Sequence, residues 1–323
     1  NTYNEVLLHL FLFFQIAIHL AHPMNILIVI NGLSDKSVSV EASAATLIKS
    51  YPEHSVDIRV TKSAGDSFRY AYGATTHKVD AILACGGDGT LNEVVNGAFN
   101  ANPQNRVLFA HYPCGNANDL AKTIGGHDLK YYLEGIISGK HESIDCAFIE
   151  RNGKERRFVN GSTAGIGALV CKDVSTLRRS LPSKLNYLVN TLAWVIKYKR
   201  PFVKIEMDNE VYEGEMLLSV MGKGHFVSNG LGFAPQAKLS GGDFGVTVVS
   251  RASVWEMISF RAKLSKKDRI DRHEVTYYSS NKVKITVLSG QMPVETDGEF
   301  LDILYENESI VFELDKNALC LVM

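Results

Sequence analysis

A glycine-rich turn around one carboxylate is the part of the chain best suited to chemistry. Gly86, Gly87 and Gly89 surround Asp88, after an apolar segment at 79–84 and before a helical pattern over 90–99. Glycines let a backbone approach a ligand closely, and the first amides of the helix favour an anion such as a phosphate. Bare phosphate would repel Asp88, so a bridging metal ion or a substrate hydroxyl is expected there. The alternative is a tight strand-to-helix connection with a solvated Asp.

The polar residues that follow the turn favour the ligand site. Asn92, Glu93 and Asn96 lie on the first turns of the predicted helix, near the same opening. A simple connection between a strand and a helix requires no such polar groups.

A second polar segment, at 113–121, follows another predicted strand and opens a helix at Asn118 and Asp119. An Asn or Asp at this place is often only an N-cap. In a parallel sheet, however, this segment can lie beside the Asp88 turn. Two glycine-containing strand ends from one sheet would then form a nucleotide site.

The arrangement of predicted elements supports such a sheet. From Met24 to about Asp145, strands and helices alternate with short connections, which predicts a parallel sheet covered on both faces. Ligands of these sheets bind at the carboxyl ends of the strands, where both glycine turns lie. The expected strands are 26–30, 55–60, 81–84 and 106–110, with helices at 39–51, 64–75 and 90–99.

Beyond about Ser143, short β-rich runs separated by turn residues predict an antiparallel β domain. A hairpin turn is expected at 208–210, and helices at about 185–198 and 254–264. The β-rich runs are 144–149, 157–160, 202–207, 215–221, 244–250, 282–288 and 310–314.

The composition is that of an ordinary globular protein. The chain has 323 residues, 46% of them hydrophobic, with 34 Lys and Arg against 35 Asp and Glu. This length predicts two domains, and a formal net charge of −1 gives no bulk attraction for nucleic acid. Five scattered cysteines fit a reducing compartment such as the cytoplasm better than a disulfide framework or a zinc site.

The first 23 residues need separate treatment. The apolar stretch 6–21 is interrupted by His9, Gln15 and His19, and it is shorter than the ~20 residues that span a bilayer. Without a basic start or a clear cleavage site, a secretory signal is not expected. Met24 is the expected natural start, which makes 1–23 an upstream or non-native extension; the alternative is an interfacial anchor.

Two glycine-rich or acidic segments lie in the β-rich part. Residues 160–168 hold more glycine than a strand tolerates well, which indicates either a close backbone approach or a bulge. Residues 294–299 predict a turn with three carboxylates. On the surface this turn has no special role, but beside a cleft Glu299 could act as a general base for a hydroxyl nucleophile.

Basic runs at 197–200 and 261–273 are typical of solvated helix ends. They could also contact anionic lipid headgroups. Because no convincing membrane-spanning helix is present, transient peripheral membrane contact is expected.

In this order, the segments resemble the catalytic domain of the diacylglycerol kinase family, which also contains sphingosine, ceramide and bacterial lipid kinases. The resemblance covers most of the chain from Met24 onward. The family's Gly-Asp-Gly-Thr turn and its Asn-Glu-Val-x-Asn-Gly continuation are met in full within 86–97. Its Pro-x-Gly-Thr-x-Asn-Asp-Phe-Ala segment is similar to 113–121, and its late Asp-Gly-Glu matches 297–299.

Three departures from the family pattern stand out. In the second segment, Asn116 replaces Thr and Leu120 replaces Phe. The opening Asn-Pro-x-Ser-Gly loop keeps its Asn and Ser as Asn31 and Ser34 but lacks the Pro. The Asp-Asp-Gly that holds a structural magnesium in bacterial lipid kinases corresponds to 240–242, which reads Ser-Gly-Gly with Asp243 only nearby.

The resemblance implies a phosphofructokinase-like or NAD-kinase-like α/β domain over 24–145, then a β-sandwich over 146–323 whose last strands could return to the first domain. ATP would bind in the cleft between them. Asp88 and Glu299 would be catalytic. Mg²⁺ would be held by Asp88 through water, and a structural metal by Asp243. The implied cofactor-binding residues are Asn31, Ser34, Gly86, Gly87, Gly89, Thr90, Glu93, Gly115, Asn116, Asn118, Asp119, Asp145 and Asp297.

The implied function is an ATP- and Mg²⁺-dependent lipid kinase that phosphorylates a diacylglycerol-like or sphingoid-like hydroxyl. The expected partner is therefore a lipid at a membrane surface, with no nucleic acid, and a homodimer is one option for the assembly. Two alternatives remain. A NAD kinase shares the glycine turn, and a non-catalytic nucleotide- or lipid-binding protein would explain the changes at Asn116 and 240–241.

Overall fold

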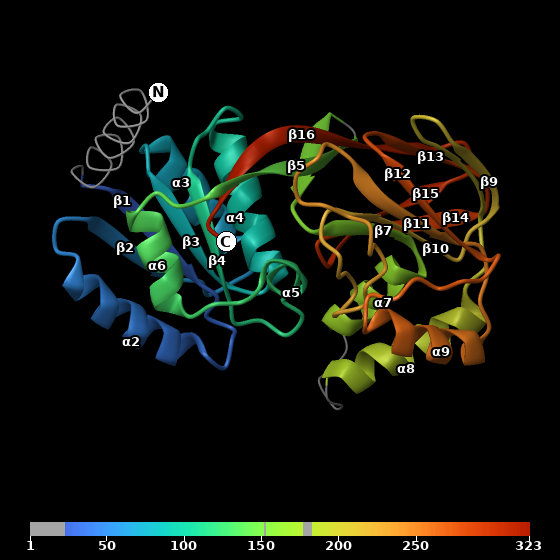
Figure 1. Cartoon of the computed structure of the whole chain (residues 1–323), viewed down its shortest axis with the longest axis horizontal. Coiled ribbons are helices and arrows are strands. Elements are labelled where there is room, and N and C mark those ends of the chain that lie inside the picture. The colour runs from blue at the N-terminus through green and yellow to red at the C-terminus, as the bar shows by residue number, and fades with distance from the viewer. Residues whose placement is uncertain (1–22, 152, 177–182) are drawn as a thin grey trace, which may run out of the picture.

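The structure is a computed structural model that describes residues 23–151, 153–176 and 183–323. The predicted extension at 1–23 therefore lies almost wholly outside the described residues. Two bodies stand side by side, an α/β domain and a β-rich domain, connected by long strands (Figure 1).

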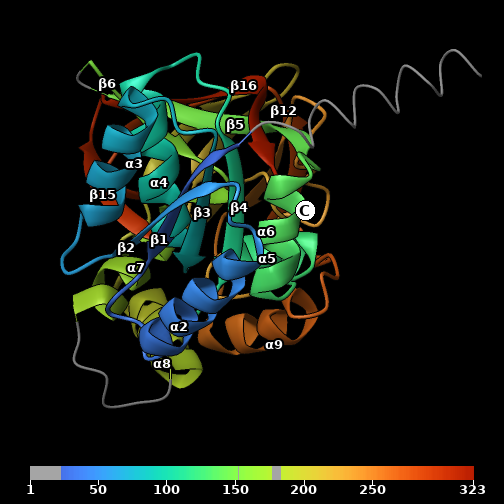
Figure 2. The same ribbon diagram turned by 90° about the vertical axis from the view of Figure 1, so that its left-hand side faces the viewer.

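The N-terminal domain contains the predicted parallel sheet, with strand order β2-β1-β3-β4. Its central strands are apolar and buried on both faces, because helices cover each side. One hydrophobic cluster joins the sheet to α3 and α4, and another joins it to α2 and α6 (Figure 2). The elements are β1 (Asn25–Ile30), α2 (Ser37–Leu47), η1 (Ile48–Ser50), β2 (Ser55–Val60), α3 (Asp66–Thr76), β3 (Ala81–Gly86), α4 (Asp88–Ala101), β4 (Leu108–Pro113), α5 (Asp119–Ile124) and α6 (Leu129–Ile137).

The C-terminal part is a sandwich of two β layers around one apolar cluster. One layer is the antiparallel sheet β12-β11-β10-β7-β14-β15, and the other contains β16, β13, β8 and β9. The strands are β5 (Glu142–Arg151), β6 (Lys154–Phe158), β7 (Gly161–Gly165), β8 (Phe202–Glu206), β9 (Val211–Glu215), β10 (Leu218–Gly222), β11 (Phe244–Val249), β12 (Val275–Ser280), β13 (Val283–Ser289), β14 (Gln291–Thr296), β15 (Glu299–Tyr305) and β16 (Ser309–Leu321). The helices α7 (Ile166–Thr176), α8 (Ser183–Lys197) and α9 (Val254–Leu264) pack together beside this sandwich (Figure 1).

Two long strands connect the domains. β16 pairs antiparallel with β5 along most of its length, and its end pairs in parallel with β4. The two domains therefore share one hydrogen-bonded sheet, and the boundary placed after Asp145 falls inside β5.

The predicted fold class, a parallel α/β domain followed by an antiparallel β domain, is confirmed. The acidic segment at 294–299 forms the predicted turn, as the hairpin between β14 and β15, with positive φ at Asp297 and Gly298, and the side chains of Glu295 and Asp297 in it are buried. The glycine-rich segment at 160–168 forms β7 and the first turn of α7. A Cβ on Gly165 would lie 2.4 Å from the carbonyl oxygen of Leu217, so the close backbone approach, rather than a bulge, explains that glycine.

Candidate active site

The two glycine turns predicted to meet are in direct contact. A Cβ added to Gly115 would lie 2.4 Å from the Cα atom of Gly87, so position 115 tolerates no side chain at the contact. A Cβ on Gly86 would lie 2.2 Å from the hydroxyl oxygen of Thr90, which folds back over the turn. Close approach of a backbone at Gly115 and of the Thr90 side chain at Gly86 therefore explains these glycines, and the two turns form a cradle at the carboxyl ends of β3 and β4.

Asp88 links the cradle to the next helix. Its carboxylate accepts hydrogen bonds from the backbone N–H groups of Asp119, at 2.9 Å, and Leu120, at 3.1 Å. Asn118 lies in the left-handed region at φ 51°, and its side chain both accepts from and donates to the backbone of Gly115. The first turns of α4 and α5 thus converge; Asp88 occupies the first amides of α5, so the start of α4 is the end whose amides favour phosphate groups.

The loop after β1 borders the same cradle. The Ser34 hydroxyl donates to the carbonyl oxygen of Cys114 at 3.0 Å, and Asn31 accepts from the N–H of Leu33. Asn116 lies exposed in the turn beside them. The predicted residues Asn31, Ser34 and Asn116 are therefore brought together with the glycine turns.

The β14–β15 hairpin places Glu299 opposite the Asp88 turn. A Cβ on Gly89 would lie 3.3 Å from one carboxylate oxygen of Glu299. The other oxygen of that carboxylate forms an ion pair with Arg156 on β6. Burial raises the pKa of Glu299; the Arg156 guanidinium opposes this rise, and the carboxylates of Glu93 and Asp297 add to it. A carboxylate with a raised pKa beside a phosphate cradle has the properties of a general base.

Asp119 lies at the other side of the cradle. Its carboxylate accepts from the Lys122 ammonium at 3.0 Å and from the N–H of Asn229, in a loop of the β domain, at 2.9 Å. Burial and the nearby Asp88 raise the pKa of Asp119. Lys122 and Arg156 are site residues that the sequence interpretation missed. Lys122 had a detectable signal, three residues after Asp119 on a helix, but Arg156 is one of several charges on a strand.

Two asparagines of the family signature turn away from the cradle. Asn92 and Asn96 are buried and donate from their side-chain amides to the carbonyl oxygen of Arg157, and Asn96 also accepts from the N–H of that residue. Glu93, between them, accepts from the N–H of Gly65 at the start of α3, and its charge helps to raise the pKa of Glu299. The two asparagines thus attach α4 to β6 of the other domain, so the expectation that they face the ligand opening was wrong.

Asp297 is also enclosed by protein. Its carboxylate accepts four hydrogen bonds, from the N–H groups of Val159, Asn160 and Gly161 and from the side chain of Asn92. It fixes the hairpin that carries Glu299. The contacts of Asp297 thus give it a positioning role and no direct place at a nucleotide.

Asp145 is not brought to the cradle. It is buried on β5, where its carboxylate accepts from the Lys223 ammonium and from the N–H groups of Gly242 and Asn317. Asp243 accepts from the hydroxyl of Ser279. The Lys223 ammonium already occupies the Asp145 carboxylate and the Asp243 carbonyl oxygen, and Ser279 occupies the Asp243 carboxylate, so these residues do not fit the implied structural magnesium.

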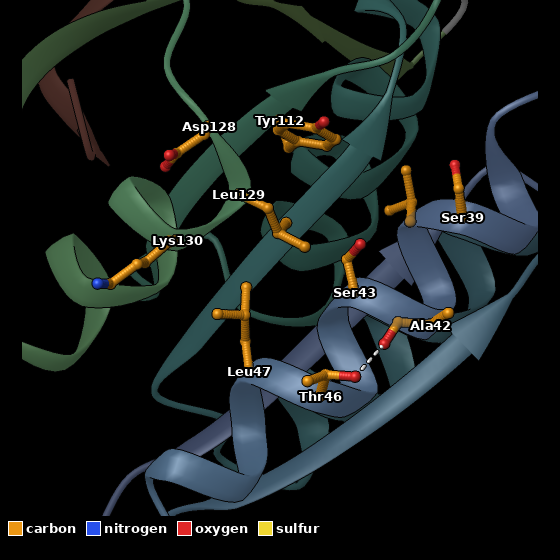
Figure 3. A pocket seen from close by; sticks show the side chains of 10 residues that line it. Ser39, Ala42, Ser43, Thr46, Leu47, Tyr112, Asp128, Leu129 and Lys130 are labelled. Carbon is orange, nitrogen blue, oxygen red and sulfur yellow. Dashed lines mark hydrogen bonds between the residues drawn. The ribbon is translucent and has the colours of Figure 1, made fainter.

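A separate hollow of about 580 Å³ lies between α2 and α6. It is lined by Leu47 and Leu129, with Tyr112 and Asp128 on the α6 side (Figure 3). The Asp128 carboxylate caps α6 by accepting from the N–H of Tyr131. The lining therefore carries no catalytic pair, and the hollow lies outside the contacts that form the cradle.

Comparisons with known proteins agree with this architecture. Residues 25–149 match the diacylglycerol kinase catalytic domain, and residues 161–311 match the YegS C-terminal NAD kinase beta sandwich-like domain. The diacylglycerol kinase of Bacillus subtilis is 32% identical over 249 residues, which cover 74% of this chain and 78% of the relative. That of Staphylococcus haemolyticus is 28% identical over 241 residues, covering 74% and 71%.

Solved structures show the same fold. A diacylglycerol kinase from Bacillus anthracis superposes with a TM-score of 0.67 at 22% identity, over 93% of this chain and 96% of that chain. Yeast NADH kinase has a TM-score of 0.50 at 11% identity, over 93% and 83%. No helix in the described residues is long and apolar enough to cross a membrane. On the matched domains and the Bacillus subtilis relative, the chain belongs to the diacylglycerol kinase family.

Proposed function

We propose that the protein is a lipid kinase that transfers the γ-phosphoryl group of ATP to the hydroxyl of a diacylglycerol-like or sphingoid-like lipid. The observation that carries the proposal is the placement of Glu299, from the β domain, against Gly89 in the cradle. A module that only binds nucleotide needs phosphate-binding amides but no carboxylate with a raised pKa opposite them.

The proposed reaction is an in-line displacement. Glu299 accepts the proton of the lipid hydroxyl while the hydroxyl oxygen forms a bond to the γ-phosphorus. The bond from that phosphorus to the β,γ-bridging oxygen breaks, and ADP leaves with its electron pair. Such transfers depend mainly on positioning and charge stabilisation. The amides of the cradle can stabilise the phosphate charge, and Lys122 and Arg156, which pair with Asp119 and Glu299, balance the carboxylates around it.

The residues of the cradle fit a nucleotide-bound Mg²⁺. Both oxygens of Asp88 already accept backbone hydrogen bonds, so the side chain would hold the ion through water. Bound with ATP, Mg²⁺ would neutralise phosphate charge.

A kinase assay tests this function. The protein is incubated with radiolabelled ATP, Mg²⁺ and mixed micelles of diacylglycerol, sphingoid base or ceramide, with NAD as a further acceptor. Glu299→Gln should lower kcat by about 10²–10⁴-fold, whereas Glu210→Gln, in an exposed turn between β8 and β9, should not change it. Labelled NADP would identify a NAD kinase. Nucleotide binding without any labelled product would favour the binding protein.

We further propose that the face formed by α8 and α9 brings the enzyme to an anionic membrane. Trp255 on α9 is 80% exposed and Ile196 on α8 is 74% exposed, with Ile258, Val189 and Leu185 also exposed. The two helices lie at the end of the molecule toward which the parallel strands point (Figure 2). Residues 251–273 hold seven Lys and Arg against three Asp and Glu. Exposed apolar side chains with an excess of positive charge suit an anionic interface.

Vesicle sedimentation tests this face. Trp255→Ser should weaken binding to vesicles of phosphatidylcholine with phosphatidylserine by at least tenfold. Val211→Ser removes another exposed apolar side chain, on β9 away from the face, and should have no effect. The assignment would be refuted if both variants lost vesicle binding equally, or if binding did not depend on the phosphatidylserine content of the vesicles.

A further inference from the structure

A lysine is buried where β5, the end of β10, the loop before β11 and the strand β16 meet around Asp145, a place that we call the joint between the domains. Lys223, directly after β10, has no solvent exposure, and its ammonium donates to the Asp145 carboxylate at 2.8 Å and to the carbonyl oxygen of Asp243 at 2.9 Å. Lysine is almost never fully buried unless it is paired, so this position demands an explanation. Lys223 lies outside the proposed catalytic cradle.

The buried pair ties several segments together. Asp145 lies on β5, the first strand to cross between the domains, and it also accepts from the N–H groups of Gly242, at 2.8 Å, and Asn317, at 3.1 Å. Gly242 precedes β11, and Asn317 lies on the returning strand β16. One carboxylate therefore collects donors from the end of β10, the loop before β11 and β16. Burial alone would raise the pKa of Asp145, but the hydrogen bonds from Lys223, Asn317 and Gly242 bring it below its usual range.

The same place is where the family resemblance implied a structural magnesium. The loop reads Ser-Gly-Gly at 240–242, and the Asp243 carboxylate is engaged by Ser279. An ammonium already occupies the contact with Asp145 at 2.8 Å. A divalent cation beside that ammonium would meet strong like-charge repulsion at short range in a site without solvent.

We propose that the Lys223 ammonium is the resident cation of this joint, so that the chain carries a tethered positive charge in the place of a bound metal. The joint needs one positive charge to satisfy the buried Asp145 carboxylate, and Lys223 supplies it without depending on ion concentration. The architecture of the two domains is then independent of divalent ions, and any Mg²⁺ requirement belongs to the nucleotide.

Thermal unfolding without nucleotide tests the inference independently of catalysis. Addition of Mg²⁺ to EDTA-treated protein should change Tm by less than about 1 °C, since no structural site is left to bind it. A saturable rise in Tm with Mg²⁺ that persists in Asp88→Asn would overturn the proposal, because Asp88 is the side chain that faces nucleotide-bound Mg²⁺. This measurement is made on protein that retains Lys223, so it does not depend on whether a variant at the joint folds.

Variants at the joint supply the second arm. Lys223→Met should lower Tm by about 10 °C, because the Asp145 charge is left buried and unpaired. The double variant Lys223→Met/Asp145→Asn should regain at least half of that loss. Lys282→Met breaks an exposed ion pair with Glu313 and should shift Tm by less than about 2 °C. A Lys223→Met protein as stable as the wild type would contradict the assignment.

Discussion

Glu295 should make the protein less stable as the pH rises from about 5 to 8. This residue lies on β14, is 5% exposed, and accepts a hydrogen bond from the N–H of Gly298 at 2.7 Å. Burial is the main reason that its pKa rises from 4.5 to about 8, and the Asp297 charge adds to the effect. The folded protein therefore keeps Glu295 protonated at pH values where the unfolded chain has released that proton.

The sign and size of the effect follow from this pKa difference. Between the two pKa values the folded state binds more protons than the unfolded state, so the free energy of unfolding falls with rising pH. A shift from 4.5 to about 8 corresponds to about 5 kcal/mol once the pH is well above 8. By the same relation, about 3 kcal/mol of this loss is reached at pH 7 and less than about 1 kcal/mol at pH 5.

The perturbation that removes the effect is Glu295→Gln, which retains an acceptor for Gly298 and cannot ionise. Urea unfolding of this variant and the wild type, from pH 5 to pH 8, should give curves that agree near pH 5 and diverge upward for the variant. Glu210→Gln should follow the wild type, since its carboxylate lies in an exposed turn. Parallel profiles for Glu295→Gln and wild type would show that Glu295 ionises normally in the fold and refute the reasoning.

Three further substitutions probe the cradle and its support. Gly115→Ala should weaken ATP binding in calorimetry by at least about tenfold, because its Cβ would collide with Gly87; Gly73→Ala on α3, where a Cβ meets nothing within 4 Å, should leave ATP binding unchanged. Asn92→Ala should lower the free energy of unfolding by about 1–3 kcal/mol, measured in urea, because buried partners lose a donor. Asp297→Asn should lower kcat more than it raises the KM for ATP, since the residue positions Glu299 and does not face the nucleotide.

The glycine turns were predictable from sequence because their physics is local. A strand, three glycines in four positions and a helix specify a close backbone approach without knowledge of distant residues. The meeting of the Gly87 and Gly115 turns also followed from topology, since consecutive parallel strands place their carboxyl ends at one edge. The fold class was predictable for the same reason.

The roles of the polar residues were not predictable, because they depend on contacts far apart in the chain. Asn92 contacts Asp297 across 205 residues, and Lys223 contacts Asp145 across 78. The periodicity of the sequence places a polar side chain on a helix or a strand, but it does not show whether a distant residue supplies a buried hydrogen-bonding partner. The burial of Glu295 likewise depends on the packing of its strand, β14, against α7, and neither element carried a clear sequence pattern.

The helix α4 connects the two halves of the proposed chemistry. Its first residues form the phosphate cradle, while Asn92 and Asn96 in its next turns hold β6, whose Arg156 pairs with Glu299. Gly97 lets the same helix pack against α3, since a Cβ there would lie 2.4 Å from the carbonyl oxygen of Phe68. One helix thus fixes the position of the cradle in its own domain and the position of Glu299, the proposed base, in the other. The distance between the cradle and Glu299 is therefore set by α4 as a rigid body, which explains why the signature motif continues beyond the residues of the cradle.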